Sequence, residues 1–270
     1  MCIRDRLSIC LIDDLIELPV WVRLFTQISC TVLMIEIGGM NLLNLGPLFG
    51  FEDIILSYYL GFVFTIFCVV GIMNAFNMID GINGLCSGCA MLALLLIGFY
   101  SGLIYDSMLV LVIGSMIGFI LFNLRMFGKK RGVFLGDSGS NLIGFWVAWC
   151  AIYASQNSFY NVQPITMLWF VAIPFLDCIG LIFSRIRKGV SWMSPGRDHI
   201  HHKLLRHFSP EGALFLILVI TLVTGLIGIY IEDNSSPGIS LLMFITYAFI
   251  YYVFAGYDED YKNSDINKNV

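Results

Sequence analysis

Long runs of apolar residues alternate with short polar segments along most of the chain. Each run is close to the length of about 20 residues that a helix needs to cross a bilayer. Because backbone groups inside a bilayer must be paired within the segment, we expect a helix at each run and no strands. The pattern predicts an all-α, polytopic transmembrane helix bundle of about eight spans plus an N-terminal stub, with spans near 20–37, 55–73, 88–104, 108–124, 142–155, 164–184, 213–231 and 238–256.

The composition agrees with a membrane protein. Of the 270 residues, 58% are hydrophobic and 13% are charged, which is too apolar a balance for an ordinary soluble domain. We predict one integral membrane domain over 1–270, with an atypical start at 1–12 and a polar tail at 257–270. The apolar residues 7–12 are too few to span a bilayer, so we expect the sequence to be an N-terminally incomplete version of a longer protein.

The eight cysteines lie mostly inside apolar runs, where they act as small hydrophobic side chains. We expect no disulfide framework. The Cys86-x-x-Cys89 spacing is typical of redox or metal sites, but it stands alone at the start of an apolar run.

The positive charges predict the orientation. If the spans alternate, one side receives 13–19, 74–87, 125–141, 185–212 and 257–270. Of the 15 Lys and Arg residues, Arg4 and Arg6 belong to the atypical start, and the other 13 all fall at or beside this side. Positive residues mark the cytoplasm. We therefore expect every polar motif to open to the cytosol, where nucleotide-activated substrates are found.

The first polar motif follows the apolar run at 55–73 and contains Asn77, Asp80 and Asn83, with glycines at 81 and 84. A carboxylate at the mouth of a membrane helix faces water, a cation or a charged ligand. Glycine lets the backbone approach a ligand closely because it has no Cβ. The alternative is a solvated loop that merely ends a helix.

Two more carboxylate motifs fall on the same side. Asp13-Asp14 is a pair that cannot stay fully ionised near lipid without a cation or a base, which suits metal binding or proton abstraction; a helix C-cap is the alternative. Asp137 lies among glycines and serines at 136–140, after a basic run. A tight turn at a helix start favours anions, and Asp137 either holds Mg²⁺ there or acts as an N-cap.

A histidine cluster follows within the basic segment 185–210. Arg197 precedes His199, His201 and His202, which are three of the four histidines in the chain. Zinc would need a further ligand and another spacing. Diphosphate binding or acid/base catalysis fits better, and attraction of the basic residues to lipid headgroups is the alternative.

Two single polar residues stand within or at the end of apolar runs. Asp177 is an intramembrane carboxylate, which predicts either a functional site or a structural pairing. Asn123 closes the run at 108–124 and is either a helix cap or a ligand contact.

Taken together and in this order, the motifs resemble the polyprenyl-phosphate N-acetylhexosamine-1-phosphate transferase family. The resemblance extends from Asp13 to about residue 256. The His-Ile-His-His form is similar to the branch that makes undecaprenyl-pyrophosphoryl N-acetylglucosamine, whereas the peptidoglycan-precursor branch usually has a plain run of three histidines. The motifs that carry it are Asp13-Asp14, Asn74-Ala75-Phe76-Asn77-Met78-Ile79-Asp80-Gly81, Phe122-Asn123, Phe134-Leu135-Gly136-Asp137-Ser138-Gly139-Ser140 and His199-Ile200-His201-His202.

The resemblance implies a multi-pass enzyme of the bacterial inner membrane. It would transfer a sugar 1-phosphate, N-acetylglucosamine 1-phosphate in this branch, from a UDP-N-acetylhexosamine to a polyprenyl phosphate such as undecaprenyl phosphate, releasing UMP. This is the first membrane step of cell-envelope polysaccharide synthesis. The implied cofactor is Mg²⁺, or Mn²⁺ in its place. Nucleic acid is not an expected partner, and a homodimer is left open.

The resemblance also assigns roles to the candidate residues. Asp13, Asp14 and Asp137 are expected to be catalytic, with Asp137 and Asp14 on the metal and Asp13 contacting or deprotonating the lipid phosphate. The expected substrate-binding residues are Asn77, Asp80, Asn83, Asn123, Asp177, Arg197, His199, His201 and His202.

The sequence departs from the family pattern in two places. The family bundle usually has ten or eleven spans, so helices are expected upstream of Met1. The common Asp-Gly-x-Asp-Gly pattern has Asn83 in place of the second aspartate. An amide carries no negative charge, so a metal role for that position does not transfer directly.

Three other functions remain to be distinguished. The phospho-N-acetylmuramoyl-pentapeptide transferases of peptidoglycan synthesis share the motifs. An intramembrane aspartyl protease would pair Asp80 with Asp137, but it would place both inside the bilayer and leave the histidines unused. A transporter would need polar residues strung through several spans, and apart from Asp177 these runs are nearly free of them.

Overall fold

The computed structural model describes residues 20–50, 52–128, 132–160, 162–187, 189 and 199–255. Within these ranges the chain is all-α, and its only β pairing is an isolated bridge between Asn44 and Ile55. The helices are α2 (Val20–Gly38), α3 (Tyr58–Ile79), α4 (Leu85–Ser101), the 3₁₀ turn η1 (Leu103–Tyr105), α5 (Ser107–Asn123), α6 (Gly136–Gln156), α7 (Pro164–Phe170), α8 (Ala172–Arg187), α9 (Ile200–Leu204), α10 (Pro210–Asn234) and α11 (Pro237–Phe254).

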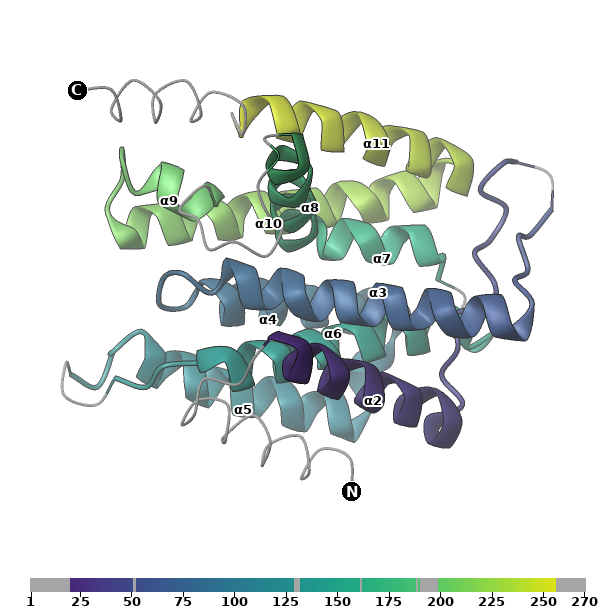
Figure 1. The fold of residues 1–270 in the computed structure, drawn as a ribbon, viewed down its shortest axis with the longest axis horizontal. Coiled ribbons are helices and arrows are strands. Elements are labelled where there is room, and N and C mark those ends of the chain that lie inside the picture. Colours follow the sequence, from purple (N-terminus) through teal and green to yellow (C-terminus); the bar gives the residue numbers. More distant parts are fainter. Residues whose placement is uncertain are drawn as a thin grey trace.

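Most of these helices lie side by side in one bundle, and the chain reverses direction between successive long helices from α2 to α7 and between α10 and α11 (Figure 1). The connections after α3 and after α5 lie at the same end of the bundle as α9. The 39–57 segment lies at the opposite end. This alternation is the one that the hydropathy pattern predicts, and it gathers the described polar motifs at one end.

The predicted helix positions are confirmed, but two helices extend further into polar sequence than predicted. α3 continues to Ile79, and α6 begins at Gly136. Polar residues that we expected in connecting segments, among them Asn77 and Asp137, therefore lie on helices. Their positions are fixed by regular backbone geometry, with neighbours three and four residues apart on one face.

The predicted single span at 164–184 is wrong in one respect. It consists of two helices, α7 and α8, which meet at an angle of 84°. Pro174 explains the break, because a proline has no N–H to donate to the carbonyl of Phe170, four residues earlier, and its ring clashes with that carbonyl. α7 ends at Phe170. As a result α8 runs across the other helices (Figure 1).

The number of membrane spans stays a prediction. Among the described residues, four helices are long and apolar enough to cross a membrane, namely α2, α3, α10 and α11, and the bent α7–α8 pair would be a fifth. α4 and α5 are apolar but shorter, with 17 residues each. The predicted total of eight spans requires both of these and α6 to cross as well.

α3 and α6 pack closely against each other. A Cβ added at Gly144 would lie 2.9 Å from the Cα of Met73, so only glycine permits this approach. Small residues let membrane helices come close enough for extensive van der Waals contact, which drives their association. This contact places the last turns of α3 against the first turns of α6, where the polar motifs lie.

Candidate functional site

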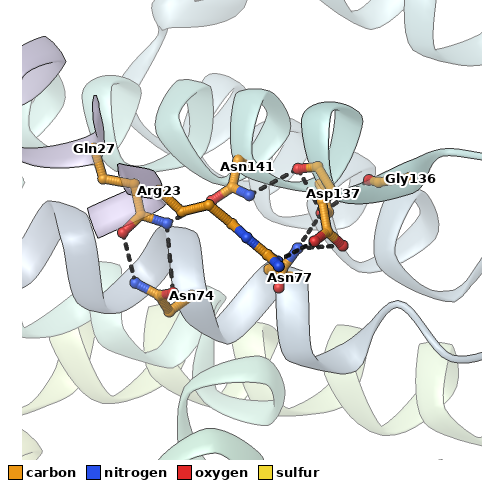
Figure 2. Close-up of polar contacts among 8 residues, drawn as sticks. Arg23, Gln27, Asn74, Asn77, Gly136, Asp137 and Asn141 are labelled. Carbon is orange, nitrogen blue, oxygen red and sulfur yellow. Dashed lines mark hydrogen bonds and ion pairs between the residues drawn. The ribbon is translucent and has the colours of Figure 1, made fainter. Parts of the chain in front are cut away.

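The site is built at the end of the bundle where α3 ends and α6 begins. Asp137 lies in the first turn of α6 and points toward α2 and α3 (Figure 2). One of its carboxylate oxygens forms an ion pair with Arg23 of α2, and the other accepts a hydrogen bond from the side-chain amide of Asn77 at 3.2 Å. Asp137 is therefore not the N-cap of α6, because its carboxylate faces the site instead of its own helix.

The Arg23–Asp137 pair remains accessible. The two side chains keep 34% and 43% of their surface exposed. Asn77 also donates to the hydroxyl of Ser140 at 2.9 Å, so its amide is held by two partners on α6. Asn77 thereby fixes the orientation of the Asp137 carboxylate, and a ligand can still reach that carboxylate from outside.

An amide network lies beneath this pair. The side-chain amide of Gln27 donates to Asn141 at 2.7 Å, and Asn74 donates to the side-chain oxygen of Gln27 at 2.9 Å. Asn141 in turn donates to the main-chain oxygen of Asp137 at 2.7 Å. Figure 2 shows that the network joins α2, α3 and α6. Hydrogen bonding of this kind is what allows polar groups to be buried among apolar helices.

The turn between α3 and α4 forms a second part of the site. Asp80 follows the last residue of α3, and Asn83 lies half-buried further along the turn. Asn123, at the end of α5, holds this turn in place: its side-chain oxygen accepts the N–H of Gly84 at 2.5 Å, and its amide donates to the carbonyl of Val133 at 2.7 Å. Asn123 is itself buried, so its visible role is to position the turn.

Asp80 lies in an unfavourable environment for a charged carboxylate. Burial, and then the negative charge of Asp137, raise the pKa of Asp80 to about 6. A positive charge close to such a pair of carboxylates stabilises their ionised forms. Arg23 supplies a positive charge next to Asp137.

The histidines form the third part. His199 contacts Asp177 through its Nδ1, at 2.8 Å from the carboxylate. His201 is 1% exposed, and its imidazole lies directly over Gly81: a Cβ at Gly81 would be 1.9 Å from its Nε2. Burial, followed by the charges of His202 and His199, lowers the pKa of His201 to about 4. His201 is therefore neutral at physiological pH.

The structure brings most of the predicted site residues together. Asp137, Asn77 and Asp80 lie at the α3–α6 junction, and His201 lies on the glycine next to Asp80. Asp177 is paired with His199, which is the structural alternative that the sequence left open for it. Asp13, Asp14 and Arg197 lie outside the described residues.

Sequence reasoning gave no role to five polar residues on the helix faces, although two of them, Asn74 and Ser140, lie within the quoted motifs: Arg23, Gln27, Asn74, Ser140 and Asn141. A signal was available. Arg23 and Gln27 are four residues apart in an apolar run, and so are Asp137 and Asn141. That spacing places each pair on one helix face, and a charged or amide group within a membrane helix indicates a partner.

The arrangement suits an anionic ligand bound together with a cation. Positive charge from Arg23 and the neutral ring of His201 stand near two carboxylates at this end of the bundle. Among the described residues, no group of three or more His, Cys, Asp or Glu side chains is close enough to hold a metal ion by itself. A cation here would share the ligand's own oxygens or use residues outside the described ranges.

The chain is similar to several known proteins. Residues 6–155 match glycosyl transferase family 4. The chain is 35% identical over 252 residues to the undecaprenyl-phosphate alpha-N-acetylglucosaminyl 1-phosphate transferase of Yersinia pestis, covering 88% of this chain and 68% of that protein. It is 33% identical over 247 residues to the protein of the same name from Escherichia coli K12, covering 89% and 67%.

Proposed function

Because the chain belongs to glycosyl transferase family 4, we propose that it transfers N-acetylglucosamine 1-phosphate from UDP-N-acetylglucosamine to undecaprenyl phosphate and releases UMP. The relatives are named for this acceptor and this sugar, which favours the reaction over the peptidoglycan-precursor alternative. The observation that carries the proposal is the meeting of Asp137, Asp80 and the histidine segment at one end of an apolar bundle. A water-soluble nucleotide sugar and a membrane-bound lipid phosphate could meet there.

The reaction is an exchange at phosphorus. An oxygen of the lipid phosphate forms a bond to the β-phosphorus of the nucleotide sugar, the bond from that phosphorus to the bridging oxygen breaks, and UMP leaves with the electron pair. The work of the protein is positioning and charge stabilisation. Arg23 would offset negative charge on the diphosphate, the histidines would offer it hydrogen bonds, and Asn77 would keep the Asp137 carboxylate oriented. Asp13 would contact or deprotonate the lipid phosphate.

Mg²⁺ is the cofactor that this donor set fits. Carboxylate oxygens are its preferred protein ligands, and it keeps several waters, so one or two carboxylates suffice. Asp137, with Asp14 from outside the described residues, would hold it; each oxygen of Asp137 retains a lone pair beyond its bond to Arg23 or Asn77. When bound, the ion would neutralise charge that develops on the diphosphate.

The remaining candidate roles belong to the same proposal. Asp80 and Asn83 would contact the nucleotide from the α3–α4 turn. Arg197 and His202 would engage the sugar-diphosphate end. The one-sided distribution of Lys and Arg supports a bacterial inner-membrane protein with these segments in the cytoplasm.

The intramembrane protease reading is not favoured. Such an enzyme needs two aspartates that share a proton, and here Asp137 is paired with Arg23 instead. The match to glycosyl transferase family 4 argues against a protease independently of this ion pair.

The test is the Asp137→Asn variant, assayed in membranes for UMP release from UDP-N-acetylglucosamine with undecaprenyl phosphate present. The change keeps the volume and removes the charge, so kcat should fall on the order of 10²-fold or more. Asp233→Asn is the matched control, because Asp233 is an exposed carboxylate at the opposite end that accepts a hydrogen bond from Tyr100. Nearly full activity in Asp137→Asn would remove Asp137 from the reaction, and no UMP release by the unaltered chain would argue against the function.

A further inference from the structure

The histidine segment is attached to the bent helix α8 through one buried carboxylate. Asp177 is 1% exposed, and both of its oxygens are used: one lies 2.8 Å from Nδ1 of His199, and the other accepts the main-chain N–H of Ile200 at 2.9 Å. The two bonds go to consecutive residues. They fix both a side chain and the backbone at the point where α9 begins.

A second contact fixes the other face of the same segment. The His201 ring lies against Gly81, and neither ring nitrogen has a hydrogen-bond partner among the described residues. Its ring also stacks on that of His199, with centroids 5.3 Å apart and planes 16° from parallel. The position of His201 over the α3–α4 turn is therefore set by packing and by the attachment of its neighbours.

α9 needs such an attachment, since it has only five residues. A helix this short is unstable in isolation because the cost of nucleation is not recovered. His199 is its N-cap residue, but its side chain makes no capping hydrogen bond to α9. Asp177 accepts the N–H of the first helical residue in its place, so the cap comes from a different helix.

The bend between α7 and α8 carries this carboxylate to the segment. α8 also packs against the last turn of α3, where the sulfur atoms of Cys178 and Met78 are 3.5 Å apart. α8 therefore contacts both the helix that leads to Asp80 and the segment that carries the histidines. A displacement of Asp177 would change the distance between these two halves of the site.

From this geometry we propose that Asp177 is a positioning residue that docks the histidine segment over the Asp80–Gly81 turn. The sequence led us to expect a substrate contact at Asp177, and burial of both carboxylate oxygens argues against one. Asp177 acts through His199 and the backbone of Ile200, which hold His201 and His202 in register with the turn. The importance of this register for turnover rests on the function proposed above, but the docking itself does not.

Hydrogen exchange tests the docking without requiring turnover. In the chain reconstituted into lipid nanodiscs, Asp177→Ala should speed exchange of the 199–205 amides by about tenfold or more, because a hydrogen bond to a charged group is lost. Asp177→Asn should restore part of the protection, since its amide oxygen can still accept the N–H of Ile200. Unchanged exchange at 199–205 in both variants would overturn the proposal.

Glu232→Ala is the matched control, because Glu232 on α10 also accepts a main-chain N–H, that of Gln163, at the opposite end of the bundle. It should leave exchange at 199–205 unaltered. Equal effects of Glu232→Ala and Asp177→Ala would show a general loosening and would contradict a local docking role. If Asp177→Ala does not fold, Asp177→Asn carries the test, and equal protection of 199–205 in Asp177→Asn and the unaltered chain then counts against the pairing with His199.

Kinetics provide a second readout. If the histidines contact the nucleotide sugar equally in the ground state and the transition state, misplacing them raises KM and leaves kcat nearly unchanged. Asp177→Asn should therefore raise KM for UDP-N-acetylglucosamine about tenfold, with kcat within about threefold. A large fall in kcat with unchanged KM would contradict a positioning role. Absence of UMP release by the unaltered chain would count against the proposed function, while the exchange result would still decide the docking.

Discussion

Asp80 and Asp137 are carboxylates from separate helices that the fold brings close enough to affect each other's charge. Asp137 has a positive partner, the Arg23 guanidinium, whereas no ion pair with Asp80 is found among the residues that the structure describes. Asp80 is the carboxylate whose ionisation costs the fold free energy at neutral pH, because its pKa is raised to about 6. An added cation would relieve that cost.

The first prediction follows from this cost. The folded state binds a proton at Asp80 more tightly than the unfolded state, so the contribution of Asp80 to stability falls as the pH rises from about 4 through about 6. Asp80→Asn should therefore raise the melting temperature at pH 7.5, by roughly 2–4 °C for ~1 kcal/mol in a chain of this size. The gain should disappear near pH 4. Scanning calorimetry in detergent at both values measures it.

The Asp80→Asn variant must be compared with the unaltered chain at each pH, because the contribution of His201 to stability depends on pH in the opposite direction. Its pKa is lowered to about 4, so the unfolded state binds the extra proton and stability rises with pH from about 4 to 6.5. The His201 contribution is present in the unaltered chain and in Asp80→Asn, so it cancels in the difference between their melting temperatures. A gain from Asp80→Asn that is equal at pH 4 and pH 7.5 would refute the electrostatic explanation.

The second prediction concerns Asn83, which stands where the family usually has an aspartate. If the position contacts the uridine or the sugar, an amide can serve, since it donates as well as accepts. Asn83→Asp should then shift the KM for the nucleotide sugar by a few-fold and leave the half-saturating Mg²⁺ concentration unchanged. Mg²⁺ titrations of the initial rate in both proteins test this. A clear drop in half-saturating Mg²⁺ for the variant would instead assign the position to the metal.

The sequence identified the aspartates and histidines of the site, because each stands out from apolar or glycine-rich surroundings. It did not identify the residues that hold these side chains in place. Gln27 and Asn74 contact each other although 47 positions separate them; Gln27 lies outside every motif, and the motif that begins at Asn74 does not indicate this partner. Pairing between faces of different helices depends on which faces pack together, and that is a tertiary property. The same reason explains why Asp177 could be recognised as important but not assigned to His199.

At the scale of helices, the α3–α6 contact determines where the site forms. Hydropathy located both helices but ended α3 about six residues early and began α6 about six residues late. The discrepancy has one cause: the polar end turns are stabilised by partners across the contact, which an apolar pattern does not register. The break in 164–184 had a local signal, Pro174, but proline alone does not fix an angle of 84°.

The third prediction tests this contact. Gly144→Ala would place a Cβ 2.9 Å from a backbone atom of α3, so the helices must separate, at a cost of about 1–3 kcal/mol. The melting temperature should fall by several degrees, measured by thermal unfolding in detergent. Gly118→Ala on α5 is the control, because a Cβ there meets nothing within 4 Å. Equal melting temperatures for the two variants would mean that the α3–α6 contact is looser than described.

At the scale of the whole molecule, the alternating helices divide the connections between two ends. The end with α9 holds the site, and the end with the 39–57 segment carries no Lys or Arg in that segment. At that end Gln156 holds the segment by accepting the N–H groups of Leu43 and Asn44 and donating to the Asn44 carbonyl. The sequence predicted this division from apolar runs and charges alone, because both depend on the bilayer and not on packing details.

The fourth prediction is topological. In a background without accessible cysteines, His207→Cys at the site end and Ser158→Cys at the opposite end should react with a membrane-impermeant thiol reagent from opposite sides of the membrane. Both residues are exposed. We expect His207→Cys to be labelled from the cytosolic side only. Labelling of both cysteines from one side would rule out the alternation on which the location of the site depends.

The amide network of Gln27, Asn74 and Asn141 also has a consequence for how this sequence can evolve. Gln27 bonds to both of the others, so replacing it by leucine removes a partner from each, and replacing either asparagine removes a partner from the buried Gln27. Replacing all three by apolar residues of similar shape can be nearly neutral by comparison. The three positions are therefore linked through Gln27. In descendants of this sequence, the three should be retained together or change together, and they should covary across α2, α3 and α6.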